Sequence, residues 1–171
     1  MSFAFTHLIA AWLCGKLYEF TFKKKIFHYV WFFLLFGAIL PDADYLVDWT
    51  LGTEIHRTFT HSIFFVILAP LVLYFLLQLI GHSQKKPMSI AIAVGIVTHL
   101  LLDMSGGHGV PLLWPSLFHF SVNGVTYNPL TPPFLKSNLM ELQFYLKRAI
   151  LDMALGTTWI FFLWWRKKLK F

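Results

Sequence analysis

Residues 62–80 have the sequence SIFFVILAPLVLYFLLQLI, an apolar stretch without a charged side chain. The hydrocarbon core of a bilayer is about 30 Å thick, and a helix needs about 20 mostly apolar residues to cross it. The stretch therefore predicts a transmembrane helix over about residues 62–81. It is the cleanest of several such segments and decides the class of fold that we expect.

Four further segments are apolar and long enough to form helices of the same kind, some of them weakly. They cover about residues 3–22, 26–47, 88–105 and 146–165. Composition supports this prediction, because 57% of the 171 residues are hydrophobic, 19% are aromatic and only 13% are charged. We expect an all-α fold: a single integral membrane domain over residues 1–171, with about five transmembrane helices and a long, partly embedded loop between the fourth and fifth.

The basic side chains predict the orientation of the chain in the membrane. They cluster at the ends of the apolar segments, which argues against nucleic acid as a partner despite a net charge of +6. Ten of the 14 lie in connections on one side, and the other four are Arg57, Lys136, Lys147 and Arg148. Because cytoplasmic loops are rich in lysine and arginine, we expect a multi-pass protein of the inner (cytoplasmic) membrane, with its N-terminus outside and its C-terminus in the cytoplasm.

A small set of ionisable side chains interrupts the apolar segments. Such groups are costly at membrane depth, so they usually face a bundle interior and mark function. The motifs that carry them are Thr6-His7, Leu40-Pro41-Asp42-Ala43-Asp44, His56-Arg57, Thr60-His61-Ser62, and His99 with Asp103. At about 1.5 Å per helical residue, four predicted helices bring these side chains to one level near the outer interface.

His99 and Asp103 have the spacing i, i+4, which stacks two side chains on one face of a helix. An imidazole and a carboxylate placed in this way can bind one divalent ion together, as two histidines at that spacing do in zinc proteases. The alternative is a histidine that is simply hydrogen-bonded to a helix carboxylate. The position of the pair inside an apolar segment, level with other ionisable groups, favours the metal.

Asp42 and Asp44 follow Pro41, which discourages helix for the residue before it. A polar turn that leaves the membrane would explain one of these aspartates better than two. Two carboxylates this close repel each other, and a cation between them is the usual remedy. Either one of them is a ligand and the other a general base, or both bridge two ions.

His56 and His61 cannot share a helix face, because they are about 140° apart around a helix. We therefore expect His56 in a loop and His61 at the start of the next helix, with the cap at Thr60 or Ser62. Ser62 lies in no Gly-x-Ser-x-Gly elbow, so this is not a serine-hydrolase motif. The adjacent Arg57 either contacts a phosphate through paired N–H donors or is an interfacial side chain reaching for water.

At these motifs, together with Gly109 through Trp114-Pro115, the chain resembles the bacterial and archaeal family of LexA-regulated, membrane-bound, metal-dependent hydrolases. The resemblance covers residues 6 to 115. That family is distantly similar to the zinc-dependent phospholipases C and the zinc-dependent single-strand nucleases, which are helical phosphodiesterases with several metals. The resemblance implies a metal-dependent hydrolase and phosphoester substrates. The soluble relatives use further ligands, and only His108, His119 and Glu141 stand where such ligands could be.

We therefore expect a membrane-embedded hydrolase in which one or more divalent ions activate water against a phosphoester of a phospholipid or another lipid-linked substrate. The predicted metal ligands are His7, Asp42, Asp44, His56, His61, His99 and Asp103. Asp42 is a ligand or a general base, and Arg57 stabilises the phosphate. Zinc fits this mixed ligand set best, with manganese as the alternative.

Membrane lipids are the expected environment and substrate, whereas the oligomeric state is not indicated by the sequence. The competing hypothesis is a divalent-metal transporter that uses the same cluster. Transporters usually hold their site near the bilayer midplane and often contain repeats. The predicted ligands lie towards one face and no repeat is visible, so we prefer the hydrolase.

Overall fold

The computed structural model describes residues 4–53, 55–105, 109–116, 118–127 and 139–166. The helices in these ranges are α1 (Ala4–Phe22), α2 (His28–Ile39), α3 (Asp44–Leu51), α4 (Ile63–Leu79), α5 (Lys85–Met104) and α6 (Leu139–Trp165). Single 3₁₀ turns, η1 (Pro41–Ala43) and η2 (Phe59–His61), precede α3 and α4. Two short antiparallel strands, β1 (Phe118–Ser121) and β2 (Gly124–Tyr127), form a hairpin.

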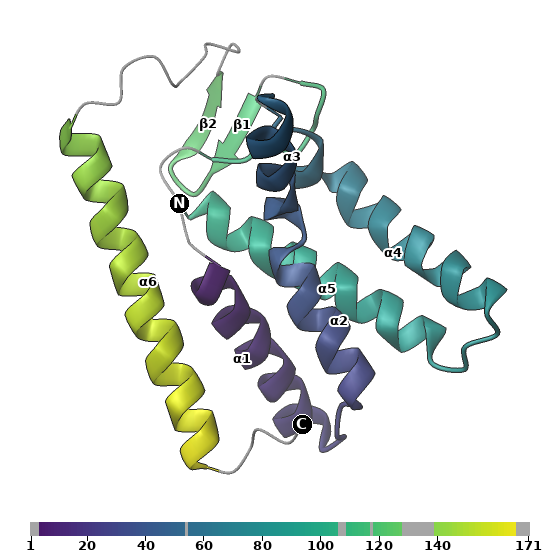
Figure 1. Cartoon of the computed structure of the whole chain (residues 1–171). Helices are drawn as coiled ribbons and strands as arrows, with labels where there is room; N and C mark the ends of the chain where they lie inside the picture. Colours follow the sequence, from purple (N-terminus) through teal and green to yellow (C-terminus); the bar gives the residue numbers. More distant parts are fainter. Residues whose placement is uncertain (1–3, 54, 106–108, 117, 128–138, 167–171) are drawn as a thin grey trace.

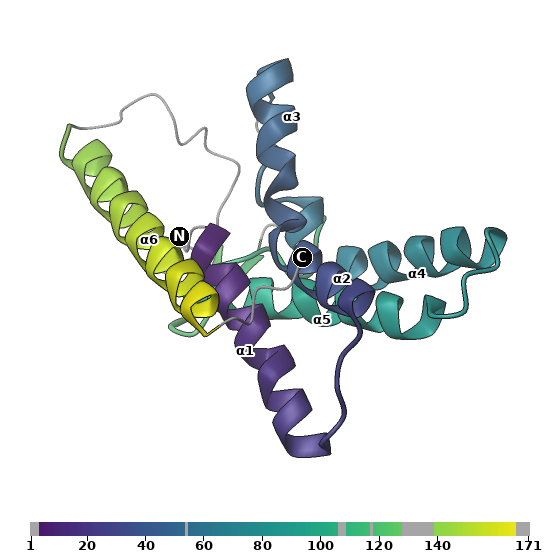
Figure 2. The same ribbon diagram turned by 60° about the horizontal axis from the view of Figure 1, so that its bottom comes forward.

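The helices lie side by side around α5. This helix packs against α2, α4 and α1, and α1 in turn packs against α2 and α6 (Figure 1). Helix α3 and the hairpin lie at the same end of the molecule. Figure 2 shows α3 pointing away from the other helices. The end that carries α3 and the hairpin is also where α2 and α5 finish and where α1 begins.

The crossing of α2 and α5 is tight because glycines face each other there. A Cβ atom on Gly95 would lie 2.3 Å from the carbonyl oxygen of Leu34, and one on Gly37 would lie 2.4 Å from that of Ile92. Small residues of this kind let helix backbones touch, as they do between helices in membranes. The contact holds the last turn of α2 directly against the second half of α5.

Most predicted helices are present, with two corrections to their bounds. The segment 26–47 is not one helix, since α2 ends at Ile39 and the chain bends by 55° into η1 and α3. Pro41 explains the break, because its ring clashes with the preceding turn and it lacks an N–H donor. The last helix begins at Leu139 rather than near residue 146.

The described part of the connection between α5 and α6 contains regular structure that an all-α prediction omits. Val110 exchanges backbone hydrogen bonds with Phe120 of β1, and Ile63 at the start of α4 donates to the carbonyl of Leu112. The fold is therefore mostly helical with a small β-hairpin attached to it. Whether this connection is embedded in lipid stays a prediction.

Length and composition alone do not establish five membrane crossings. Among the described helices, α5 is the one long and apolar enough to cross a membrane. Helix α2 passes only when it is joined to the bent segment Pro41–Leu51, and α4 is apolar but has 17 residues. Core helices of soluble proteins pass the same test, so the five crossings stay a prediction.

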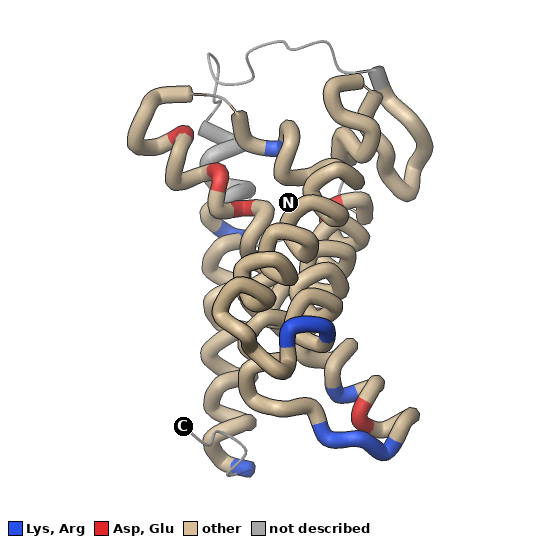
Figure 3. The backbone as a smooth tube through the Cα atoms, turned by 90° about the vertical axis from the view of Figure 1, so that its right-hand side faces the viewer, with Lys and Arg blue, Asp and Glu red and all other residues tan. Residues whose placement is uncertain are grey.

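Charge is divided between the two ends of the molecule. Figure 3 shows most lysines and arginines at the end where the C-terminus lies and most acidic residues at the opposite end. The acidic end is the end that carries η1 and α3. The predicted site residues Asp42 and Asp44 lie at this end.

Candidate metal centre

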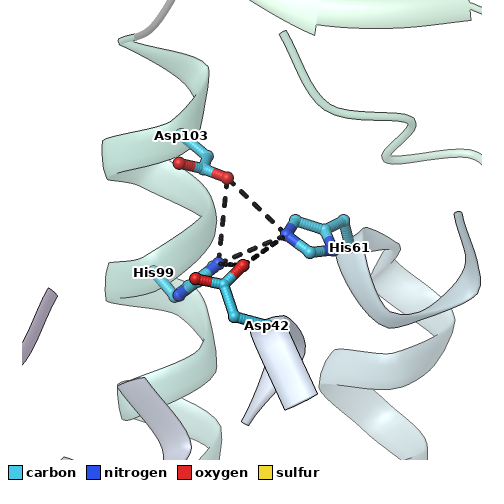
Figure 4. A group of neighbouring side chains, drawn as sticks. All are labelled: Asp42, His61, His99 and Asp103. Atoms are coloured by element: carbon cyan, nitrogen blue, oxygen red, sulfur yellow. Dashed lines mark hydrogen bonds and ion pairs between the residues drawn. The ribbon is translucent and has the colours of Figure 1, made fainter. Parts of the chain in front are cut away.

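Four side chains from separate parts of the chain meet at the acidic end of the helices. Asp42 comes from η1, His61 from η2, and His99 and Asp103 from the last two turns of α5 (Figure 4). One ligand atom from each lies within 4.8 Å of the others. The two histidine side chains are fully buried and that of Asp103 is 3% exposed, whereas that of Asp42 is 26% exposed. Asp42 is thus the member that solvent can reach.

The spacing of these atoms matches that of a small tetrahedral ion. The Nε2 atoms of His61 and His99 are 3.3 Å apart, and each lies 3.5 Å from Oδ1 of Asp42. Their distances to Oδ2 of Asp103 are 3.6 and 3.8 Å. Zinc bonds of about 2.0–2.1 Å place tetrahedral ligand atoms about 3.3–3.4 Å apart. The four side chains already have nearly this arrangement.

A backbone hydrogen bond fixes the orientation of His99. Its Nδ1 lies 2.7 Å from the carbonyl oxygen of Ala38, which can only accept, so Nδ1 carries the proton. A neutral imidazole with that tautomer has a free lone pair on Nε2, the atom that faces the cluster. The bond depends on the tight crossing, because Gly95 lies one turn before His99 and Gly37 directly precedes Ala38.

His61 is oriented through a hydroxyl relay. The Thr60 hydroxyl donates to Oδ2 of Asp44 over 2.5 Å, so its oxygen is free to accept from Nδ1 of His61, 3.0 Å away. This pattern again leaves Nε2 directed at the cluster. Burial alone would lower the pKa of His61, but the carboxylates of Asp103 and Asp42 outweigh it and hold the pKa above its ordinary value.

With these tautomers, four hydrogen-bond acceptors face one another across the cluster. Two imidazole lone pairs and two carboxylate oxygens repel unless a proton or a cation lies between them. The carboxylates of Asp103 and Asp42, which raise the pKa of His61, favour positive charge at this position. A divalent cation would satisfy all four atoms at once, which a single proton cannot do.

Asp44 and His56 lie behind His61 rather than among the four ligand atoms. The Asp44 carboxylate accepts hydrogen bonds from Nδ1 of His56 (2.7 Å), the Thr60 hydroxyl and the backbone N–H of Arg57 (3.3 Å). The His56 ring stacks on Tyr45, with ring centroids 3.5 Å apart. Asp44, His56 and His61 could hold an ion of their own, but only if these hydrogen bonds gave way.

His7 borders the cluster from α1. Its fully buried ring stacks on that of His99 with centroids 3.8 Å apart, and its Nε2 lies 3.6 Å from Oδ1 of Asp103. Neither ring nitrogen has a hydrogen-bond partner among the described residues. Buried polar atoms are normally satisfied, so these two nitrogens make His7 a candidate contact for an ion or ligand at the cluster.

Arg57 borders the cluster from the loop before η2. Its Nη2 donates to Oδ2 of Asp103 over 3.1 Å, and its Nε is buried without a partner in the described part of the chain. Its backbone has φ = 60°, a left-handed conformation that costs energy for a residue with a side chain. Strain of this kind is kept where a side chain must point in a particular direction.

Asp48, an aspartate that the sequence did not single out, supports the site. Asp48 accepts from the hydroxyl of Thr53 and from the backbone N–H groups of Ile55 and His56, which fixes the loop that carries His56 and Arg57. The sequence feature that could have predicted this role is the position of Asp48 four residues after Asp44, on the same face of α3.

The buried Asp152 of α6 accepts from the backbone N–H groups of Phe5 and Thr6 and from the Thr6 hydroxyl. It therefore caps α1 beside His7, although it belongs to a helix far away in sequence. A carboxylate inside an apolar segment is visible in the sequence, but only the fold shows that its partners are the N–H groups at the start of α1.

The further ligands implied by the resemblance do not join the cluster within the described residues. His119 lies on β1 opposite Thr126 and belongs to neither candidate group. His108 and the side chain of Glu141 lie outside the described residues.

Comparison with known proteins places the chain in a family. The sequence profile described as "YdjM inner membrane protein" matches residues 1–169, so the chain belongs to this family of inner membrane proteins. The predicted inner-membrane localisation is thereby supported. No solved structure gives a significant match.

Curated relatives match over part of their length. A segment of 85 residues is 35% identical to "Inner membrane protein YbcI" of Escherichia coli K12 and covers 46% of this chain and 49% of that protein. A segment of 80 residues is 36% identical to "Uncharacterized protein YvsG" of Bacillus subtilis 168 and covers 47% and 44%. The matches thus span about half the length of these relatives.

Proposed function

We propose that the protein is a membrane-embedded, metal-dependent hydrolase that cleaves a phosphoester of a phospholipid or another lipid-linked substrate. The main support for the proposal is the set of four acceptor atoms that face one another. The Nε2 atoms of His61 and His99 lie 3.3 Å from each other and 3.5 to 3.8 Å from the carboxylate oxygens of Asp42 and Asp103. Two imidazoles with two carboxylates suit zinc better than calcium or magnesium, which prefer oxygen ligands alone. The resemblance to membrane-bound metal-dependent hydrolases supports the same conclusion.

His61, His99, Asp42 and Asp103 are the proposed ligands, with His7 adjoining. A divalent ion bound there would lower the pKa of its water to about 7 and polarise a phosphoryl oxygen. The hydroxyl relay and the Ala38 carbonyl keep both imidazoles directed inward before any ion arrives. Held in this way, the ligands need little reorganisation when the ion binds.

Asp42 and Arg57 are the proposed catalytic residues. Asp42 is the most exposed member of the cluster, so its carboxylate could leave the ion, open a position for water and take a proton from that water. Among the described residues, the buried Nε of Arg57 has no hydrogen-bond partner, and its Nη2 already contacts the cluster. A planar guanidinium in that position suits the oxygens of a phosphate. Hydrolysis would add the water oxygen to phosphorus and break the ester P–O bond.

The five crossings, with the N-terminus outside, are part of the proposal. The gathering of basic side chains at the end opposite the cluster supports this orientation, because cytoplasmic ends are basic. Alkaline phosphatase fused after Gly52 should be active, and the same reporter fused after Gly81 should be inactive. The reverse pattern would place the cluster on the cytoplasmic side.

Turnover and metal content test the hydrolase directly. Purified protein should release phosphate-containing products from phospholipid vesicles, lose this activity with a chelator and regain it with zinc. His99→Ala and Asp103→Ala should abolish both bound zinc and turnover. His28→Ala is the matched control, since His28 is an exposed histidine at the start of α2. Turnover by folded, metal-free variants would refute the proposal.

The transporter hypothesis predicts a different result from the same preparation. Zinc flux across proteoliposomes without phospholipid turnover would favour it. The ends of α2 and α5 hold the cluster, whereas transporter sites usually lie near the bilayer midplane. We therefore retain the hydrolase as the proposed function.

A further inference from the structure

Helix α3 has a polar inner face and an apolar outer face. Asp44 and Asp48 turn inward and hold the loop before η2. On the outside, Leu46 is 63% exposed and Trp49 is 85% exposed. A helix on a water-soluble protein has the opposite arrangement. Exposed apolar surface of this extent marks contact with a membrane or another protein.

Other elements at the same end of the molecule have the same character. Exposed apolar side chains of the turn and the hairpin at this end are Leu113, Trp114, Phe118, Val122 and Val125. The ring of Trp114 packs against Phe59 of η2, and Leu112 is hydrogen-bonded to the start of α4. Within the described residues, exposed apolar side chains therefore lie at the same end of the molecule as the cluster.

The lipid bilayer is the occupant that fits this surface. The chain belongs to a family of inner membrane proteins, and α3 turns by 55° from α2 and points away from the other helices (Figure 2). Tryptophan favours the boundary between headgroups and acyl chains. Trp49 stands at one end of the molecule, and Trp164 and Trp165 are exposed at the far end of α6.

The length of α6 agrees with this placement. Its 27 residues span about 40 Å, which is close to the thickness of a bilayer with its headgroups. Tryptophans at both ends of such a molecule would form the two aromatic belts of a membrane protein. The level of α3 is then the boundary at the end that holds the cluster.

We propose that α3 lies in the lipid headgroup boundary, with Leu46 and Trp49 among the acyl chains, and that the adjacent cluster takes its phosphoester substrate directly from the lipid layer. The second half rests on the proposed function, whereas the position of α3 does not. The inference restricts the substrate to an amphipathic phosphoester presented by the membrane.

Depth measurements test the position of α3 without any assay of activity. A nitroxide is attached to Trp49→Cys in a Cys14→Ser background, and the protein is reconstituted in phosphatidylethanolamine–phosphatidylglycerol vesicles. Collisions with oxygen and with water-soluble chromium oxalate are compared with labels at Val97→Cys on α5 and at Lys24→Cys between α1 and α2. The label at residue 49 should be more accessible to oxygen than the Lys24 label and shallower than the Val97 label.

Two results would overturn the position of α3. One is a label at residue 49 that chromium oxalate reaches as easily as it reaches the label at residue 24. The other is strong dipolar broadening between labels at residue 49 on two chains, because a second copy would then cover this face. Trp49 is so exposed that its replacement leaves the packing of α3 intact.

Activity tests the delivery of substrate. Trp49→Ser and Leu46→Ser should reduce turnover of phospholipid in vesicles several-fold and leave turnover of the soluble ester bis(p-nitrophenyl) phosphate unchanged. Trp164→Ser, at the opposite end, is the control and should change neither. An equal loss on both substrates would overturn delivery from the lipid layer. If the unaltered protein cleaves neither substrate, the proposed function is wrong. The depth measurement still decides the position of α3, because it does not depend on activity.

Discussion

Asp42 and Asp44 are two residues apart in the chain, yet their carboxylates have different surroundings. Asp44 is saturated by donors from His56, Thr60 and Arg57, and it holds a loop in place. Asp42 instead faces two imidazole nitrogens, each 3.5 Å away, whose lone pairs point towards it. The difference is the supply of hydrogen-bond donors: Asp44 has donors from the protein and supports the site, whereas Asp42 lacks them among the described residues and needs a cation.

Removing a ligand should produce the largest effect. Asp42→Ala or His99→Ala leaves three acceptor atoms around the ion, and affinity should fall by more than the roughly 10–100-fold that loss of an outer partner costs. Isothermal titration of the purified protein with zinc measures this loss. Wild-type affinity in Asp42→Ala would show that Asp42 is not a ligand.

Removing the supporting carboxylate should weaken binding without abolishing it. Asp44→Ala takes the acceptor from Thr60, so the hydroxyl no longer fixes the ring of His61, and affinity should fall by about 10–100-fold. The same titration distinguishes the two aspartates. If Asp44→Ala loses the ion as completely as Asp42→Ala does, the division between ligand and support is wrong.

The crossing of α2 and α5 fixes the orientation of the His99 ring, just as Asp44 fixes that of His61 through Thr60. Gly95→Ala places a methyl group against the backbone of α2 and should lower the free energy of unfolding by about 1–3 kcal/mol. It should also weaken zinc binding, because the Ala38 carbonyl moves away from His99. Unfolding in mixed detergent measures the first effect. Val97→Ala, at a partly exposed position on α5, is the control, and an equal loss there would remove the special role of the crossing.

The cap of α1 should give the smallest effect. Asp152→Ala leaves N–H groups of α1 without their acceptor and should cost about 1 kcal/mol, comparable with loss of a helix N-cap. The effect on zinc should be slight, because His7 adjoins the cluster rather than completing it. Asp152→Asn keeps an acceptor and should recover part of the thermal stability. No change in either variant would contradict the capping role.

The sequence predicted the members of the cluster better than their roles. Ionisable residues in apolar segments are few, so helix arithmetic alone brought Asp42, His61, His99 and Asp103 to one level. Roles depend on hydrogen bonds between distant segments, such as the one from His99 to Ala38. No local pattern could show that Asp44 is already saturated.

The fold was predictable where apolar segments are uninterrupted and less so elsewhere. Helices α1, α4 and α5 follow from such segments, whereas α3 begins inside a segment that was predicted as one helix and the hairpin lies in the connection before α6. The bend at Pro41 was visible as the end of a helix, but its new direction was not. The single domain over residues 1–171 stays a prediction.

X-ray absorption at the zinc edge tests the metal centre most directly. Protein loaded with one equivalent of zinc should show a shell of nitrogen and oxygen ligands at about 2.0–2.1 Å, with outer scattering from two imidazoles. His99→Ala, if it retains any zinc, should lose one of these imidazole contributions. A six-coordinate shell of water-like oxygens, or no retained zinc in the unaltered protein, would contradict a centre built from Asp42, His61, His99 and Asp103.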